Sequence, residues 1–113
     1  MQPNILFILT DDQPGYMLDP MPQTRLRIRD VGSDFVNGHA DIPLCGPARC
    51  TLLTGLSVTS HGITINGGTW ESFKTAGLIE QSIPAYLKPA GYVTGHFGKF
   101  INGHAGDKDH VPA

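Results

Sequence analysis

The chain has 113 residues, of which 40% are hydrophobic, so its length suits one modest domain with a packed core. A formal net charge of −2 and a pI of about 6.1 argue against a nucleic-acid binder, which would carry clustered Lys and Arg. No stretch reaches the roughly 18 apolar residues that a membrane-spanning helix needs. The start of the chain lacks the segments of a signal peptide, so we expect a cytoplasmic protein or one whose leader has been removed.

The first half of the chain predicts two strands and one helix. Residues 4–10 form an apolar run that is typical of a central parallel strand buried on both faces. Residues 23–32 alternate apolar and basic side chains and predict a helix with a solvated basic face, and residues 34–40 predict a short strand. These elements alternate as they do in α/β proteins.

The second half predicts two helices and a further strand. Residues 45–55 indicate a helix with Pro47 near its start and Gly55 as its C-terminal stop. Residues 57–76 are expected to be mostly loop. Residues 82–91 predict a helix with Ser82 as its N-cap and an early end at Pro89, and residues 92–97 predict a strand.

Strands alternating with helices imply an α/β fold with a mostly parallel sheet flanked by helices. Sites in such folds form at the carboxyl ends of strands, and Asp11, Asp12 and Lys99 each follow a predicted strand. The paired carboxylates are hard oxygen ligands suited to Ca²⁺ or Mg²⁺, and the same pattern is equally typical of a solvated turn. Trp70, Phe73 and Tyr86 are expected to pack in the core or against loops.

Cys45 and Cys50 are five residues apart in the predicted helix, which separates them by about 7.5 Å along the axis and disfavours a disulfide. Neither cysteine has the spacing of a zinc site. A helix N-terminus holds anions well, so Cys45 with Arg49 one turn further on suits a nucleophile for a sulfate or phosphate ester. The residues leave a second interpretation open, in which Cys45 is a buried structural cysteine.

A resemblance to type I sulfatases extends over nearly the whole chain. Residues 45–49 (Cys-Gly-Pro-Ala-Arg) match the family's Cys-x-Pro-x-Arg motif, which continues here to Gly55. Residues 4–13 resemble the family's opening strand with its Asp-Asp pair, and residues 91–99 resemble its second conserved motif. The chain is therefore similar to the N-terminal part of a sulfatase catalytic domain, with an alkaline phosphatase-like α/β fold that is incomplete in residues 1–113.

Two further segments resemble one branch of the family. Many sulfatases carry His two residues after the lysine of the second motif, where this chain has Ile101. Residues 100–103 (Phe-Ile-Asn-Gly) and 110–112 (His-Val-Pro) are instead similar to N-acetylglucosamine-6-sulfatases and related heparan-type sulfatases.

The resemblance implies roles for five residues. A formylglycine-generating enzyme would convert Cys45 to formylglycine, an aldehyde whose hydrate attacks sulfur with one hydroxyl and expels sulfate with the other. Asp11 and Asp12, with the converted residue 45, would hold Ca²⁺ or Mg²⁺. Arg49 would stabilise the hydrate, and Lys99 would bind the sulfate group of the substrate.

The expected function is hydrolysis of sulfate esters, with sulfated sugars among the candidate substrates and His61 as a candidate substrate contact. A phospho- or phosphonate-ester hydrolase of the same superfamily is the alternative, and an inactive remnant is a further one. Sulfatase-like enzymes are several hundred residues long and draw more metal ligands from later segments. We therefore expect residues 1–113 alone to be inactive.

Overall fold

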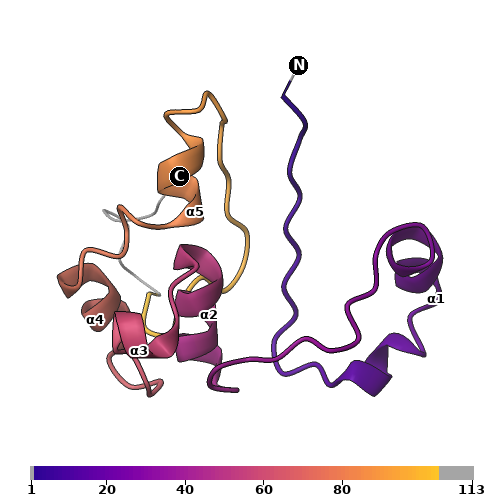
Figure 1. Ribbon diagram of the computed structural model, residues 1–113, viewed down its shortest axis with the longest axis horizontal. Helices are drawn as coiled ribbons and strands as arrows, with labels where there is room; N and C mark the ends of the chain where they lie inside the picture. The colour runs from indigo at the N-terminus through magenta and orange to yellow at the C-terminus, as the bar shows by residue number, and fades with distance from the viewer. Residues whose placement is uncertain (1, 105–113) are drawn as a thin grey trace. The chain divides into compact units, whose positions relative to one another are not determined.

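The computed structural model describes residues 2–104 and divides the chain into two compact units, Met1–His39 and Ala40–Ala113. The described part of each unit consists of helices joined by irregular segments (Figure 1). Residues 2–104 contain no helix that is long and apolar enough to cross a membrane. The segment 110–112, which carries part of the branch resemblance, lies outside the described residues.

The expected α/β fold is wrong for this structure, because residues 2–104 contain no β-strand and therefore no parallel sheet. The segments 4–10, 34–40 and 92–97, each predicted as a strand, are irregular. A strand exists only where its backbone forms a hydrogen-bond ladder with a second strand, and these segments form none with described residues. The apolar side chains of the first segment are accordingly exposed, with Ile5 and Phe7 each at 60%.

The first unit contains three short helical segments. They are the 3₁₀-helix η1 (Gly15–Leu18), the α-helix α1 (Pro22–Thr24) and the π-helix η2 (Arg25–Arg29). The helix predicted over residues 23–32 is confirmed in part, because helical structure begins one residue earlier and ends at Arg29. Pro22 occupies the first helical position, where its missing N–H group leaves no donor unsatisfied.

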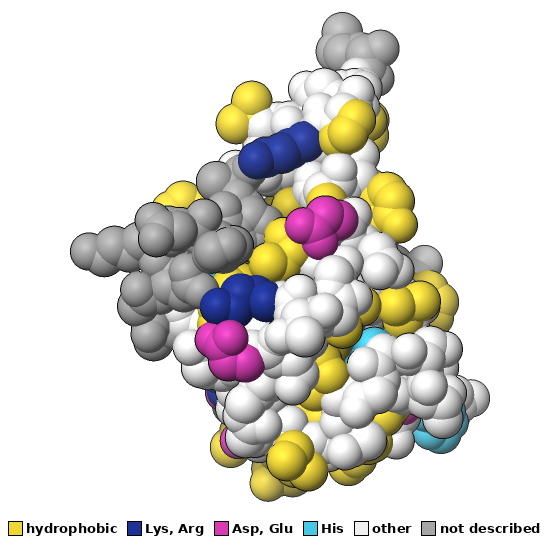
Figure 2. All heavy atoms as spheres, turned by 90° about the vertical axis from the view of Figure 1, so that its left-hand side faces the viewer, with side chains coloured by type: hydrophobic (Ala, Val, Ile, Leu, Met, Phe, Trp, Pro, Cys, Tyr) yellow, Lys and Arg dark blue, Asp and Glu magenta, His cyan; other side chains and the backbone are white. Residues whose placement is uncertain are grey.

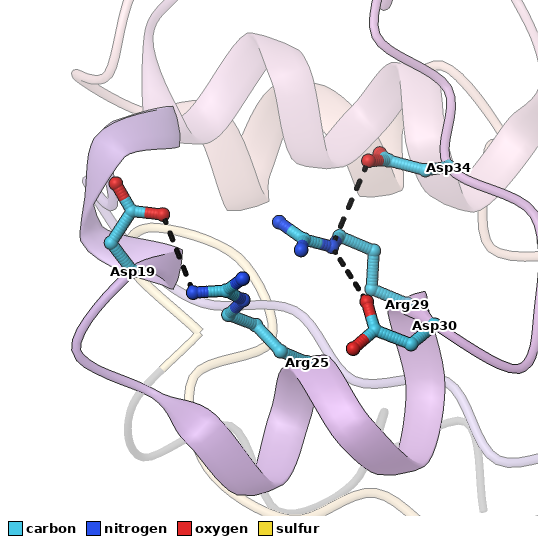
Figure 3. Close-up of polar contacts among 5 residues, drawn as sticks. All are labelled: Asp19, Arg25, Arg29, Asp30 and Asp34. Carbon is cyan, nitrogen blue, oxygen red and sulfur yellow. Dashed lines mark hydrogen bonds and ion pairs between the residues drawn. The ribbon is translucent and has the colours of Figure 1, made fainter.

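Two of the three arginines of η2, Arg25 and Arg29, pair with acidic residues of the same unit (Figure 3). Arg25 lies 3.9 Å from Asp19, and Arg29 lies 3.2 Å from Asp30 and 4.0 Å from Asp34. All five side chains are substantially accessible to solvent, so each pair contributes at most about 1 kcal/mol. The expected solvated basic face is present, with local carboxylates beside it.

The second unit contains four helices. They are α2 (Cys45–Thr54), α3 (Val58–His61), α4 (Thr69–Thr75) and α5 (Ile83–Leu87). The helix predicted over residues 45–55 is confirmed, since α2 ends at Thr54 and is followed by Gly55 in a left-handed conformation with φ 70°. The helix predicted over residues 82–91 is confirmed in part, since α5 has Ser82 as its N-cap and ends at Leu87, before Pro89. The expectation that residues 57–76 are mostly loop is wrong, since α3 and α4 lie there, both beside α2 (Figure 1).

The core of the second unit joins α2 and α4 to the segment that follows Lys99. Trp70 stacks on Phe73 with ring centroids 6.1 Å apart, and Phe100 meets Trp70 edge-on at 6.1 Å. The expectation that Trp70 and Phe73 pack in the interior is confirmed, whereas Tyr86 is 65% exposed. The buried hydrophobic cluster contains Cys50, Ile63, Trp70, Phe73, Leu78, Phe100 and Ile101.

Many other hydrophobic side chains remain in solvent. Figure 2 shows them at the surface in several separate places on the face it draws. In the second unit Val93 is 100% exposed and Phe97 is 96% exposed. Because the hydrophobic effect scales with the apolar area that leaves water, the buried hydrophobic cluster supplies most of the hydrophobic stabilisation of this unit.

This distribution predicts opposite outcomes for one substitution at two positions. Phe73→Ala removes a side chain with 0% exposure and should lower the free energy of unfolding by about 3–5 kcal/mol. Phe97→Ala, the matched control, should change it by no more than about 0.5 kcal/mol. Urea denaturation of both variants measures the difference, and similar losses at the two positions would contradict the core described above.

Candidate active site

Cys45 is the first residue of α2. Leu44, which precedes it, has an extended conformation with φ −121° and ψ 138°. The backbone N–H of Gly46, in the first turn, donates to Oδ1 of Asn66 at 2.8 Å. A residue 20 positions away thus performs the capping role that a local Ser, Thr, Asp or Asn usually performs. Pro47 lacks an N–H group, so it leaves no further donor to satisfy in this turn.

Two asparagine side chains contact the sulfur of Cys45. The thiol donates to Oδ1 of Asn66 at 3.4 Å, and Nδ2 of Asn102 donates to the sulfur at 3.3 Å. Cys45 is half-buried, whereas Cys50 is fully buried, and both are free thiols, as expected from their spacing. The start of α2 therefore presents a reachable sulfur held between an acceptor and a donor.

The surroundings of Cys45 favour its thiolate. The hydrogen bond from Asn102 is the largest cause that lowers the pKa of the Cys45 thiol, and partial burial acts in the opposite direction. The positive charge of Lys99 lowers the pKa further, as do hydrogen bonds from the Gly46 backbone and from Lys99. A lowered thiol pKa beside a cation at a helix N-terminus is typical of reactive cysteines. The structure thus brings Cys45 and Lys99 together.

Arg49 lies one turn along α2 from Cys45 and is 7% exposed. Its guanidinium donates to the backbone carbonyl of Lys99 and to that of Phe100, the latter at 3.3 Å. Arg49 therefore fixes the segment that carries Lys99 against the helix that carries Cys45. Its expected direct contact with the attacking group stays a prediction.

His61 is buried at the end of α3, and the chain itself engages both of its ring nitrogens. Nδ1 accepts the backbone N–H of Ile63 at 3.1 Å, so the proton lies on Nε2, which donates to Oγ1 of Thr51 at 3.0 Å. Burial is the main cause that lowers the pKa of His61, and the charge of Asp41 acts against it. His61 thus stabilises the α2–α3 junction in its neutral form, and its contact with substrate stays a prediction.

Asp11 and Asp12 belong to the first unit, where both are exposed and Asp12 has a positive φ of 50°. Their carboxylates suit Ca²⁺ or Mg²⁺ chemically, but Ca²⁺ takes six to eight oxygen ligands. Within residues 2–104 no group of three or more His, Cys, Asp or Glu side chains is placed to hold a metal ion. The two carboxylates therefore fit as part of a ligand set, and their assignment as metal ligands stays a prediction.

Sequence reasoning did not identify Asn66 and Asn102 as site residues. Asn66 lies within residues 57–76, which the sequence predicts to be mostly loop, and Asn102 carries only part of the branch resemblance. Ile101, which stands where many sulfatases have His, is 3% exposed in the core, and the next residue contacts Cys45 instead. Oδ1 of Asn102 is buried without a hydrogen-bond partner among the described residues, which costs about 1–3 kcal/mol.

The two cysteines should differ in reactivity. Burial raises the pKa of the Cys50 thiol to about 11, while the pKa of Cys45 is lowered, so at pH 8 only Cys45 has an appreciable thiolate fraction. Iodoacetamide should alkylate Cys45 at least about tenfold faster, as peptide mass spectrometry measures. In urea the two rates should converge. Equal rates in the folded chain would contradict these environments.

Comparisons with known proteins place the chain in a family. The family model described as Sulfatase matches residues 3–112. The chain is 41% identical over 108 residues to the extracellular sulfatase SULF-1 homolog of Drosophila melanogaster. This match covers 93% of the chain and 10% of the relative. It is 32% identical over 123 residues to N-acetylglucosamine-6-sulfatase of Homo sapiens, a match that covers 98% of the chain and 22% of the relative. It is 35% identical over 111 residues to arylsulfatase G of Rattus norvegicus, a match that covers 93% of the chain and 21% of the relative.

The chain thus spans between about a tenth and about a fifth of the length of these relatives. No solved structure gives a significant match. The motif resemblance found in the sequence is confirmed, since the family model covers almost every residue: the chain belongs to the sulfatase family.

Proposed function

We propose that this chain is the segment of a sulfuric ester hydrolase that carries the nucleophile, at Cys45. The placement of Cys45 carries the proposal: its sulfur lies at the N-terminus of α2, within the influence of the Lys99 charge and in a hydrogen bond with Asn102. A helix N-terminus and a lysine together favour an anionic group, and the charge that develops during sulfate transfer is negative.

Conversion of Cys45 to formylglycine would supply an aldehyde whose hydrate attacks the ester sulfur with one hydroxyl, so that the alcohol leaves. The second hydroxyl would then lose its proton and expel sulfate, which restores the aldehyde. Lys99 would attract the sulfate group by charge, and Arg49 would hold the Lys99 segment through its backbone carbonyls. Asp11 and Asp12 would contribute carboxylates to a bound Ca²⁺ or Mg²⁺, which would add positive charge at the sulfate oxygens.

Sulfated sugars are the proposed substrate class. The similarity to an N-acetylglucosamine-6-sulfatase, at 32% identity, supports this choice, together with the Phe-Ile-Asn-Gly segment at residues 100–103. Both sulfate and phosphate esters are tetrahedral anions that suit a cationic site, so a phosphoesterase is the enzymatic alternative. In the longest natural protein that carries this sequence, we expect turnover of an aryl or sugar sulfate and little turnover of the matching phosphate. The reverse preference would establish the alternative.

Cys45 rather than Cys50 should be converted to formylglycine. After co-expression with a formylglycine-generating enzyme, mass spectrometry of the peptide that ends at Arg49 should show the decrease in mass that accompanies conversion of the thiol to an aldehyde. A hydrazide probe should label the wild type and the matched control Cys50→Ala, but not Cys45→Ala. An intact thiol at Cys45 in every molecule would contradict the proposal and favour an inactive remnant.

Asp11→Asn and Asp12→Asn should each weaken Ca²⁺ or Mg²⁺ binding by more than about tenfold and abolish turnover at limiting metal. Each change removes a ligand charge without removing volume, so the melting temperature without metal should not change. Asp19→Asn, which neutralises another exposed carboxylate of the same unit, is the control. Full activity of both variants at limiting metal would show that other groups hold the ion.

A further inference from the structure

Two amide side chains of opposite hydrogen-bonding character contact the sulfur of Cys45 from distant parts of the chain. Asn66, 21 positions away, accepts from the Cys45 thiol, and Asn102, 57 positions away, donates to its sulfur. The two contacts, 3.4 Å and 3.3 Å long, engage the same sulfur atom. We define this pair, Asn66 and Asn102, as the amide clamp.

The orientation of Asn66 is set by the backbone. Its Oδ1 accepts the N–H of Gly46 at 2.8 Å, which only an oxygen can do, so the same oxygen faces Cys45. The approach is close, because a Cβ atom on Gly46 would lie 2.9 Å from this oxygen and 2.7 Å from Oγ1 of Thr69. Glycine at position 46 therefore allows Asn66 to reach the start of α2.

The position of Asn102 is set by the core. Its backbone carbonyl accepts the N–H of Trp70 at 3.1 Å, and the preceding residues Phe100 and Ile101 are 5% and 3% exposed. Its side-chain oxygen is buried without a hydrogen-bond partner among the described residues, so the amide group reduces stability relative to an apolar side chain of similar size. An apolar side chain at this position could not replace the hydrogen bond that the amide nitrogen donates to Cys45.

We propose that the amide clamp positions the attacking side chain of residue 45, with Asn102 donating to it and Asn66 accepting from it. This inference rests on the proposed function, in which residue 45 acts as hydrated formylglycine. An amide nitrogen can only donate and an amide oxygen can only accept. The two hydroxyls of the hydrate would therefore be held in a fixed order, one accepting from Asn102 and the other donating to Asn66.

Asn102→Leu separates positioning from a structural role, because it keeps the branched shape and the number of heavy atoms and removes the donor. In the unconverted protein its melting temperature should equal or exceed that of the wild type, since an unsatisfied buried oxygen is lost. In the converted protein kcat should fall by about 100-fold while KM stays within about twofold, because binding is kept and alignment is lost. The control Asn37→Leu makes the same change at an exposed position and should alter neither turnover nor conversion.

Conversion at residue 45, measured by mass spectrometry, is checked first in each variant so that kcat refers to converted molecules. A clear fall in the melting temperature of Asn102→Leu, or a kcat equal to that of the wild type, would overturn the inference. If the converted wild type hydrolyses no sulfate ester, the proposed function fails. The melting temperatures of the unconverted wild type and of unconverted Asn102→Leu still show whether Asn102 stabilises the fold.

Discussion

The contact between Arg49 and the carbonyls of Lys99 and Phe100 joins the helix that begins at Cys45 to the segment that carries Lys99. A guanidinium stays charged at every physiological pH, so its burial at 7% exposure is favourable only where hydrogen-bond acceptors surround it. The backbone carbonyls of Lys99 and Phe100 supply two such acceptors. Because Arg49 lies one helical turn from Cys45, satisfying this buried charge also places Lys99 close to the sulfur of Cys45.

The segment after Gly98 serves the core and the site at once. Phe100 and Ile101 are buried in the hydrophobic cluster, while Lys99 and Asn102 on either side of them act on Cys45. The N–H of Trp70 also holds the carbonyl of Asn102. Packing in the core therefore sets the hydrogen-bond geometry at the sulfur, and a loss of aromatic packing would disturb the site before any site residue changed.

Sequence reasoning predicted those parts of the fold that neighbouring residues determine. Pro47 and Gly55 act within their own turns, so the extent of α2 could be predicted to within two residues. Strands could not be predicted in the same way, because the apolar run of residues 4–10 needs hydrogen bonds from a second strand that its own pattern does not specify. The helix α4 was missed because the glycines before it are typical of a turn, although Trp70 and Phe73 have helical spacing.

The candidate site could be predicted only where a motif is contiguous in sequence. The motif distinguishes Cys45 from Cys50. Their surroundings differ because five helical residues turn the side-chain direction by about 140°, from the half-buried position of Cys45 into the core. Asn66 and Asn102 gave no comparable signal, since their contacts span 21 and 57 positions. The thiol environment thus depends on distant residues as well as on the helix that begins at Cys45. A short motif can single out one cysteine, whereas the side chains that contact its sulfur are brought there by tertiary packing.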